Sequence, residues 1–138
     1  MLAQAEPEVV EAAAEFGRRL GTAFQLIDDA LDYTGDAAAL GKNVGDDLRE
    51  GKATLPLIRV MAVGTSAQQE LVREAIRAGD GDFLAVAQAI HDTDALTHTR
   101  QVALAEAEAA ESALALLPNS PCKSAMLQLC SFAVDRAH

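Results

Sequence analysis

The sequence predicts an all-α protein, a helical bundle. Half of its 138 residues are hydrophobic, yet only 4% are aromatic and many are alanine. Apolar residues recur at helical spacing, and proline, glycine and small polar residues separate the apolar segments. A chain of this length can bury one core of modest size. We find no internal repeat, low-complexity linker or domain boundary, so we expect residues 1–138 to form a single domain.

The first helix is expected over residues 6–34. Pro7 suits a first helical turn, and the glutamates around it suit the positive end of the helix dipole. One apolar stripe consists of Phe16, Leu20, Ala23, Ile27 and Leu31. Gly17 and Gly21 lie four residues apart on another face, which favours close packing against a second helix.

A loop is expected over residues 35–53, with one short helical turn at 36–40 that Asp36 would cap. Five helices should follow, because N-cap residues, prolines and glycines mark their ends. The first is opened by Thr54 and Pro56 and ended by Gly64, and the second covers 67–78 between Ser66 and Gly79. The third covers 82–92. The fourth runs from Asp94 to Leu117 before Pro118, and the fifth from Pro121 to Arg136 after Asn119 or Ser120. In the helix over 82–92, the side chains expected to face inward are Phe83, Val86, Ala87 and Ile90. In the long helix that ends at Leu117, the apolar positions Leu96, Val102, Leu104 and Leu114 lie among many alanines.

Composition excludes several classes of protein. The net charge of −10, from 21 acidic and 11 basic residues, argues against nonspecific nucleic-acid binding. Cys122 and Cys130 lie eight residues apart in one expected helix, too far for a disulfide, so we expect buried free thiols in a reducing cytoplasm. No run of 18 apolar residues and no signal peptide is present, which is consistent with a cytoplasmic location.

Three aspartates stand near the end of the first expected helix. Asp28 and Asp32 are four residues apart and share one face, with Asp29 beside them. Like charges at this spacing cost a helix roughly a few tenths of a kcal/mol, and the helix dipole disfavours anions there. A bound divalent cation removes this penalty, and oxygen ligands suit Mg²⁺ shared with a phosphate. For the aspartates alone, a solvated acidic helix end is the simpler alternative.

The loop that follows contains glycines, Lys42 and Lys52. Lysine binds phosphate as a point charge, so acids for Mg²⁺ and lysines for a polyanion together form a coherent diphosphate site. Residues 28–52 hold seven acidic and three basic residues. Metal should therefore bind before or together with diphosphate.

The stretch FQLIDDALDYTGD, followed by LGKNVGDDLREGKATLPLI, resembles the second aspartate-rich motif of the trans-polyprenyl diphosphate synthases, and most closely their long-chain, octaprenyl-type branch. The match is dense over residues 15–60, and LPNSPCKSAMLQLCSFAVDRAH resembles the last helix of that branch. The resemblance implies the C-terminal half of the all-helical isoprenoid synthase fold. It also implies Mg²⁺-dependent addition of isopentenyl diphosphate to an allylic diphosphate.

Specific residues take roles by this resemblance. Asp28 would be a direct Mg²⁺ ligand, with Asp32 on the same face and Asp29 in support. Gln25 would orient a carboxylate or reach the substrate, and Phe24 would pack against substrate hydrocarbon or the protein core, two alternatives that the sequence does not separate.

The loop residues are assigned in the same way. Lys42 and Lys52 would contact the allylic diphosphate, an exposed loop lysine being the alternative for each. Asp47 would position the lysine loop, whereas Asp46 and Glu50 are expected to be solvated. The general base would be the diphosphate itself. The run from His91 to Asp94 is better explained by a helix terminus than by a metal cluster.

The family has an earlier aspartate-rich motif, and nothing upstream of Ala23 resembles it. We therefore expect the chain to be the C-terminal portion of such an enzyme, inactive alone, self-associating as a homo-oligomer, and lacking the residues that set product length. Its long products imply transient contact with a membrane surface. The alternatives are a non-catalytic partner subunit and another diphosphate-ionising enzyme such as a cyclase; the two-lysine loop argues against the cyclase.

Overall fold

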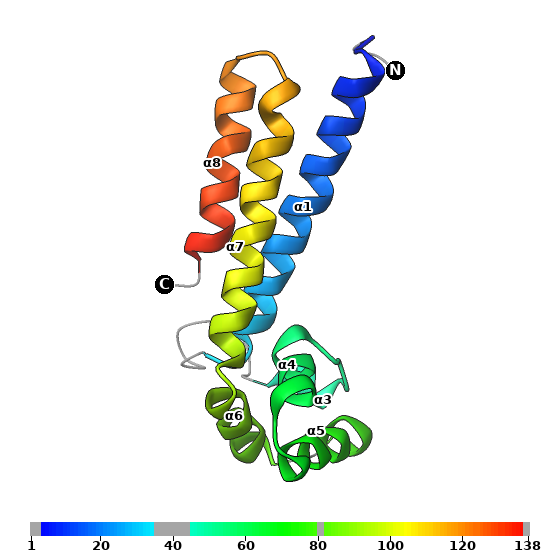
Figure 1. The fold of residues 1–138 in the computed structure, drawn as a ribbon, viewed down its shortest axis with the longest axis vertical. Coiled ribbons are helices and arrows are strands. Elements are labelled where there is room, and N and C mark those ends of the chain that lie inside the picture. The colour runs from blue at the N-terminus through cyan, green and yellow to red at the C-terminus, as the bar shows by residue number, and fades with distance from the viewer. Residues whose placement is uncertain (1–3, 35–44, 80–81, 137–138) are drawn as a thin grey trace. The chain divides into compact units, whose positions relative to one another are not determined.

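The computed structural model describes residues 4–34, 45–79 and 82–136, and the regular structure within these ranges is entirely helical. The elements are α1 (Pro7–Leu31), α3 (Asp46–Arg49), α4 (Leu55–Val63), α5 (Ser66–Ala78), α6 (Phe83–Asp92), α7 (Ala95–Ala113), the 3₁₀ helix η1 (Leu114–Leu116) and α8 (Pro121–Asp135) (Figure 1). The predicted all-α class is confirmed. The predicted turn at 36–40 lies outside the described residues.

The chain divides into two compact units. The first consists of Met1–Ile27 and Gln101–His138. Here α1 runs beside α7 and α8 (Figure 1), and its core is built from residues of all three helices and η1. The buried members of this core are Phe16, Ala110, Leu114 and Cys130. Arg19 of α1 also reaches α7, with its Nη1 atom 3.0 and 3.1 Å from the carboxylate oxygens of Glu106.

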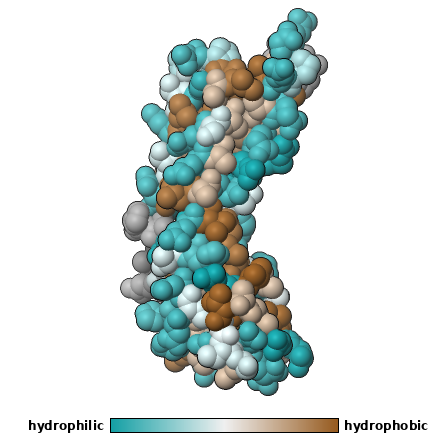
Figure 2. All heavy atoms as spheres, viewed as in Figure 1, coloured by the Kyte–Doolittle hydropathy of each residue, from teal (hydrophilic) through white to brown (hydrophobic). Residues whose placement is uncertain are grey.

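The second unit, Asp28–Arg100, contains α3 to α6. Its helices α4, α5 and α6 pack on one another around a core of branched aliphatic side chains and alanines. The buried residues are Tyr33, Leu48, Leu57, Val60, Val72, Ala75, Val86, Ala89, Ile90 and Ala95. Figure 2 shows apolar patches on a largely hydrophilic surface. Within the described ranges, no helix combines the length and apolar character needed to span a membrane.

Most helix ends lie where capping residues predicted them. Ser120 accepts a hydrogen bond from the backbone N–H of Lys123 at the start of α8, and α5 ends at Gly79, which has a φ of 70°. The predicted cap of α5 was wrong by one residue. Thr65, rather than Ser66, is the N-cap, because Thr65 and Gln68 exchange hydrogen bonds in a capping box.

The long helix α7 packs through small residues. Leu104, one of its apolar positions, is 47% exposed, whereas Ala103, Ala107 and Ala110 are buried. Alanine permits close approach of helices, so the buried stripe follows the alanines rather than the leucine. In α6, Ala87 was expected to face inward but is only half-buried, whereas Ala89 is buried.

The two cysteines differ in burial, and two glycines of α1 face open space. Cys130 is a buried free thiol, as predicted, but Cys122 is exposed because it lies in the first turn of α8. Gly17 and Gly21 were expected to pack closely against another helix. A Cβ atom added at either glycine would meet nothing within 4 Å among the described residues.

Candidate functional site

The three predicted metal ligands lie at the C-terminal end of α1. Because the helix ends at Leu31, Asp28 and Asp29 occupy its last turn and Asp32 follows directly. The backbone N–H of Asp32 donates to the carbonyl of Asp28 over 3.1 Å. Asp28 and Asp32 are half-buried and Asp29 is buried. The last turn of α1 contains no basic residue to offset the negative end of the helix dipole.

Asp32 is held by the segment that begins α3. The carbonyl of Asp32 accepts the backbone N–H of Gly45 at 3.1 Å, and its Oδ2 atom accepts the backbone N–H of Asp47 at 3.2 Å. A backbone amide bonded to a carboxylate fixes the orientation of that carboxylate. The end of the long loop is thereby joined to the aspartates.

Tyr33 forms one side of this region and is buried. Its ring stacks on that of Phe83, with centroids 6.1 Å apart and planes inclined by 5°. Burial raises the pKa of Tyr33 far above its ordinary value, and the negative charges of Asp32 and Asp47 raise it further. The hydroxyl group therefore stays neutral and adds no negative charge beside the aspartates.

Lys52 lies in the same unit and is exposed. Its Nζ atom is 2.7 Å from Oε2 of Glu50 and 3.5 Å from Oδ1 of Asp47. The hydrogen bond with Glu50 is the largest cause that raises the pKa of Lys52, so the ammonium group stays charged. Its backbone N–H also donates to the backbone carbonyl of Asp47 at 2.9 Å.

The two acidic residues expected to be solvated, Asp46 and Glu50, are both paired with basic side chains, and Glu50 is exposed whereas Asp46 is half-buried. Glu50 contacts Lys52, and Oδ1 of Asp46 lies 2.6 Å from Nη1 of Arg49. Lys42 lies outside the described residues, so its predicted phosphate contact stays a prediction.

Phe24 and Gln25 belong to the first unit, and both are exposed. Packing of Phe24 in the core, one of the two alternatives, is wrong: its side chain is 44% exposed. The guanidinium group of Arg136 lies over the Phe24 ring, 3.6 Å from its centroid. Sequence reasoning missed Arg136, because no local pattern connects residues at opposite ends of the chain.

The donor chemistry at the end of α1 fits Mg²⁺. Among the described residues, no three acidic, histidine or cysteine side chains converge on a single metal position. Mg²⁺ does not require such a cage, since proteins commonly hold it through one or two carboxylates together with substrate phosphates. Asp28 and Asp32 therefore suit a metal shared with a diphosphate.

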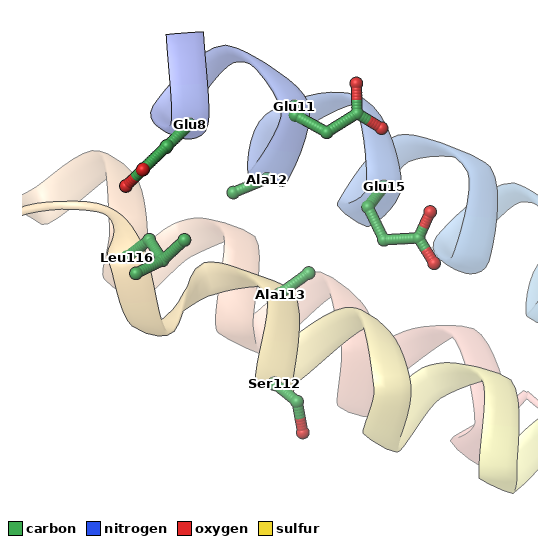
Figure 3. A pocket seen from close by; sticks show the side chains of 7 residues that line it. All are labelled: Glu8, Glu11, Ala12, Glu15, Ser112, Ala113 and Leu116. Atoms are coloured by element: carbon green, nitrogen blue, oxygen red, sulfur yellow. The ribbon is translucent and has the colours of Figure 1, made fainter. Parts of the chain in front are cut away.

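A separate groove of about 480 Å³ lies in the first unit between α1 and the end of α7 (Figure 3). Its lining residues are Glu8, Glu11, Ala12, Glu15, Ser112, Ala113 and Leu116. Glu11 and Glu15 both pair with Arg18, and Glu15 also pairs with Arg19. The groove contains none of the predicted site residues.

The sequence profile of the family described as Polyprenyl synthetase matches residues 1–111. The chain belongs to the polyprenyl synthetase family. It is 48% identical over 138 residues to the octaprenyl diphosphate synthase of Escherichia coli (strain K12), covering 99% of this chain and 43% of that protein. The chain thus spans less than half the length of this relative.

Solved structures of polyprenyl synthases agree. A decaprenyl diphosphate synthase from Rhodobacter capsulatus superposes with a TM-score of 0.89 at 34% identity, covering 99% of this chain and 43% of that one. A polyprenyl synthase from Caulobacter crescentus CB15, complexed with calcium and isoprenyl diphosphate, gives 0.85 at 39% identity, covering 97% and 42%. The helices of this chain are therefore those of a polyprenyl synthase.

Proposed function

We propose that this chain contributes the second aspartate-rich part of the active site of a long-chain polyprenyl diphosphate synthase. The observation that carries the proposal is the direct connection between Asp32 and the turn at Gly45 and Asp47, which joins the aspartates to the segment bearing Lys52. Carboxylates for a metal and a lysine for a phosphate therefore belong to one unit. Family membership and similarity to an octaprenyl diphosphate synthase support the same function.

The proposed reaction joins two diphosphate substrates. The carbon–oxygen bond of the allylic diphosphate breaks, diphosphate leaves with the electron pair, and an allylic carbocation remains. The double bond of isopentenyl diphosphate attacks this cation to form the new carbon–carbon bond, and a proton then passes to the released diphosphate. Mg²⁺ would supply neutralisation of the charge that develops on the leaving oxygens.

The residues of this chain would prepare that step. Asp28 and Asp32 would hold Mg²⁺, with Asp29 supporting them from its buried position, and Lys42 and Lys52 would bind phosphate oxygens. In the first unit, Gln25 would orient substrate or carboxylate groups, and the exposed ring of Phe24 would contact substrate hydrocarbon.

Catalysis would also need the family's first aspartate-rich motif. The given sequence has no aspartate before Asp28, so we propose that another segment or subunit supplies that motif and that these residues alone are inactive.

We also propose that the chain self-associates. In the first unit, Leu129 and Phe132 of α8 are 49% and 59% exposed, and apolar side chains of this kind favour contact with a further helix. Release of long polyprenyl products would take place at a membrane surface.

Isothermal titration with Mg²⁺ and inorganic diphosphate tests the proposal. The wild-type chain should bind the two together, and Asp28→Ala and Lys42→Ala should each weaken binding about tenfold or more. Glu108→Ala is the matched control, because Glu108 is exposed on α7 of the other unit. A parallel assay with allylic and isopentenyl diphosphates should show no turnover.

The outcomes of the titration and of the turnover assay distinguish between the functions proposed for the chain. Turnover by the chain alone would contradict the requirement for another segment. Equal binding by the wild-type chain and all variants would contradict the assigned site. A folded, self-associating chain that binds no Mg²⁺ and diphosphate would instead favour a non-catalytic partner subunit.

A further inference from the structure

Phe83 is the first residue of α6. Asp82 caps this helix by accepting the backbone N–H of Ala85 at 3.2 Å, which fixes where the helix begins. The half-buried Phe83 side chain packs against the core of the second unit. Its ring lies parallel to Tyr33 at a separation typical of offset aromatic stacking. The ring of Phe83 therefore packs against Tyr33, the residue that directly follows Asp32.

Gly45 lies against the same ring. It has a φ of 86°, a conformation that residues with a side chain rarely adopt. A Cβ atom added there would lie 2.5 Å from Cδ2 and 2.6 Å from Cε2 of Phe83. The ring thus occupies the space where a side chain would project. Glycine is required here both for the backbone conformation and for the contact.

These contacts meet at Asp32. Gly45 donates its N–H to the Asp32 carbonyl, and Asp47, two residues later, donates its N–H to the Asp32 carboxylate. The Phe83 ring therefore touches Tyr33, which follows Asp32 in the chain, and also Gly45, whose N–H is hydrogen-bonded to the Asp32 carbonyl. Every one of these groups belongs to the second unit.

We propose that Phe83 is a positioning residue of the aspartate-rich site: it clamps Tyr33 and Gly45 so that the Asp47 amide holds the Asp32 carboxylate in one orientation. This rests on the proposed function insofar as Asp32 serves a Mg²⁺–diphosphate site. Groups that orient metal ligands commonly change metal affinity by 10- to 100-fold when removed. Phe83 itself touches neither metal nor substrate.

Amide hydrogen exchange of the metal-free chain, followed by NMR, tests the clamp directly. Phe83→Ala should raise the exchange rates of the Gly45 and Asp47 amides. Ile90→Ala is the matched control, since Ile90 is buried in the same helix and the same core, about 10 Å along the axis from Phe83. That variant should lower global stability without selectively exposing these two amides.

A second measurement concerns the site. In titrations with Mg²⁺ and inorganic diphosphate, at a temperature where all variants are folded, Phe83→Ala should bind about tenfold more weakly. Ile90→Ala should bind as the wild type does. Gly45→Ala should also be less damaging in the Phe83→Ala background than in the wild type, because the clash with the ring has been removed.

Unchanged exchange at Gly45 and Asp47 in Phe83→Ala would overturn the inference. Faster exchange with unchanged Mg²⁺–diphosphate affinity would overturn it as well, because the clamp would then be structural only. If the wild-type chain bound no Mg²⁺ and diphosphate, the proposed function would fail, whereas the exchange rates and the Gly45→Ala comparison would still decide whether Phe83 holds Asp32.

Discussion

The guanidinium carbon of Arg136 lies 3.6 Å from the centre of the Phe24 ring, and the Nη2 atom of the same side chain donates to the Phe24 carbonyl oxygen at 3.1 Å. The two residues are 112 positions apart in sequence. This contact fastens the end of α8 to α1 within the first unit. It combines a cation–π interaction with a hydrogen bond from a charged donor.

Replacement of Arg136 should therefore destabilise the first unit. Arg136→Leu is expected to lower the free energy of unfolding by about 1 kcal/mol. Arg136→Lys should have a smaller effect, since it keeps the charge but loses the planar group. Urea unfolding followed by circular dichroism measures both. In a Phe24→Leu background the effect of Arg136→Leu should shrink, and strictly additive effects would argue against coupling between the two side chains.

The helix borders could be predicted because their signals are local. Ser120 followed by Pro121, and Gly79 after an apolar segment, act on the backbone of their own turn. The short helix α3 was not predicted. It has no side-chain cap, and it begins at Gly45, which has a positive φ and lies against the ring of Phe83 from another helix.

The same distinction applies to the candidate site. The first helix was expected to run to residue 34 and to include both Asp28 and Asp32, but it ends at Leu31, so Asp28 lies in its last turn and Asp32 directly after its end. One partner of the Asp32 carboxylate is the backbone amide of Asp47, which any residue except proline could supply, so the sequence carries no signal for it. Hydrophobic periodicity reports only on neighbouring residues in the sequence, so it does not predict contacts between distant segments, such as that of Arg136 with Phe24.

Two glycines should respond in opposite ways to alanine. Gly17 is exposed within α1 and has open space at its Cβ position, so Gly17→Ala should raise the free energy of unfolding by about 0.5–1 kcal/mol. Gly79 has a φ of 70°, and a Cβ there would lie 3.2 Å from the Arg49 carbonyl oxygen. Gly79→Ala should lower stability by about 1–2 kcal/mol.

Chemical denaturation of both glycine variants provides the measurement. A destabilising Gly17→Ala would show that this face of α1 is closely packed in solution, as the sequence first predicted. Repeating the measurement across protein concentrations would then reveal whether the packing partner is a second copy of the chain.

The two thiols should differ in reactivity. Cys122 is exposed and Cys130 is buried, and burial raises the pKa of the Cys130 thiol. Because the thiolate is the reactive form, Cys130 should react slowly at pH 8 for reasons of both access and ionisation. Mass spectrometry after brief treatment with iodoacetamide should find one modified cysteine in the native chain and two in urea. The Cys122→Ser variant should then show almost no native labelling.

Tyr33 should make the protein less stable at alkaline pH. Its pKa is raised in the folded state, chiefly by burial, whereas the unfolded chain should titrate near pH 10. Below about pH 10 both states keep the proton, and the tyrosine adds no pH dependence. Above that value the unfolded state loses its proton first, so stability should fall by up to about 1.4 kcal/mol per pH unit.

Urea unfolding between about pH 9 and 11 measures this effect. Tyr33→Phe keeps the ring that stacks on Phe83 but removes the ionisable group, so the difference between wild type and variant isolates Tyr33 from lysines and cysteines that titrate nearby. The chain has a single tyrosine, so phenolate absorbance near 295 nm reports on it alone. Appearance of that absorbance near pH 10, before unfolding, would mean that the hydroxyl group is exposed to solvent, and the burial of Tyr33 beside Asp32 would be wrong.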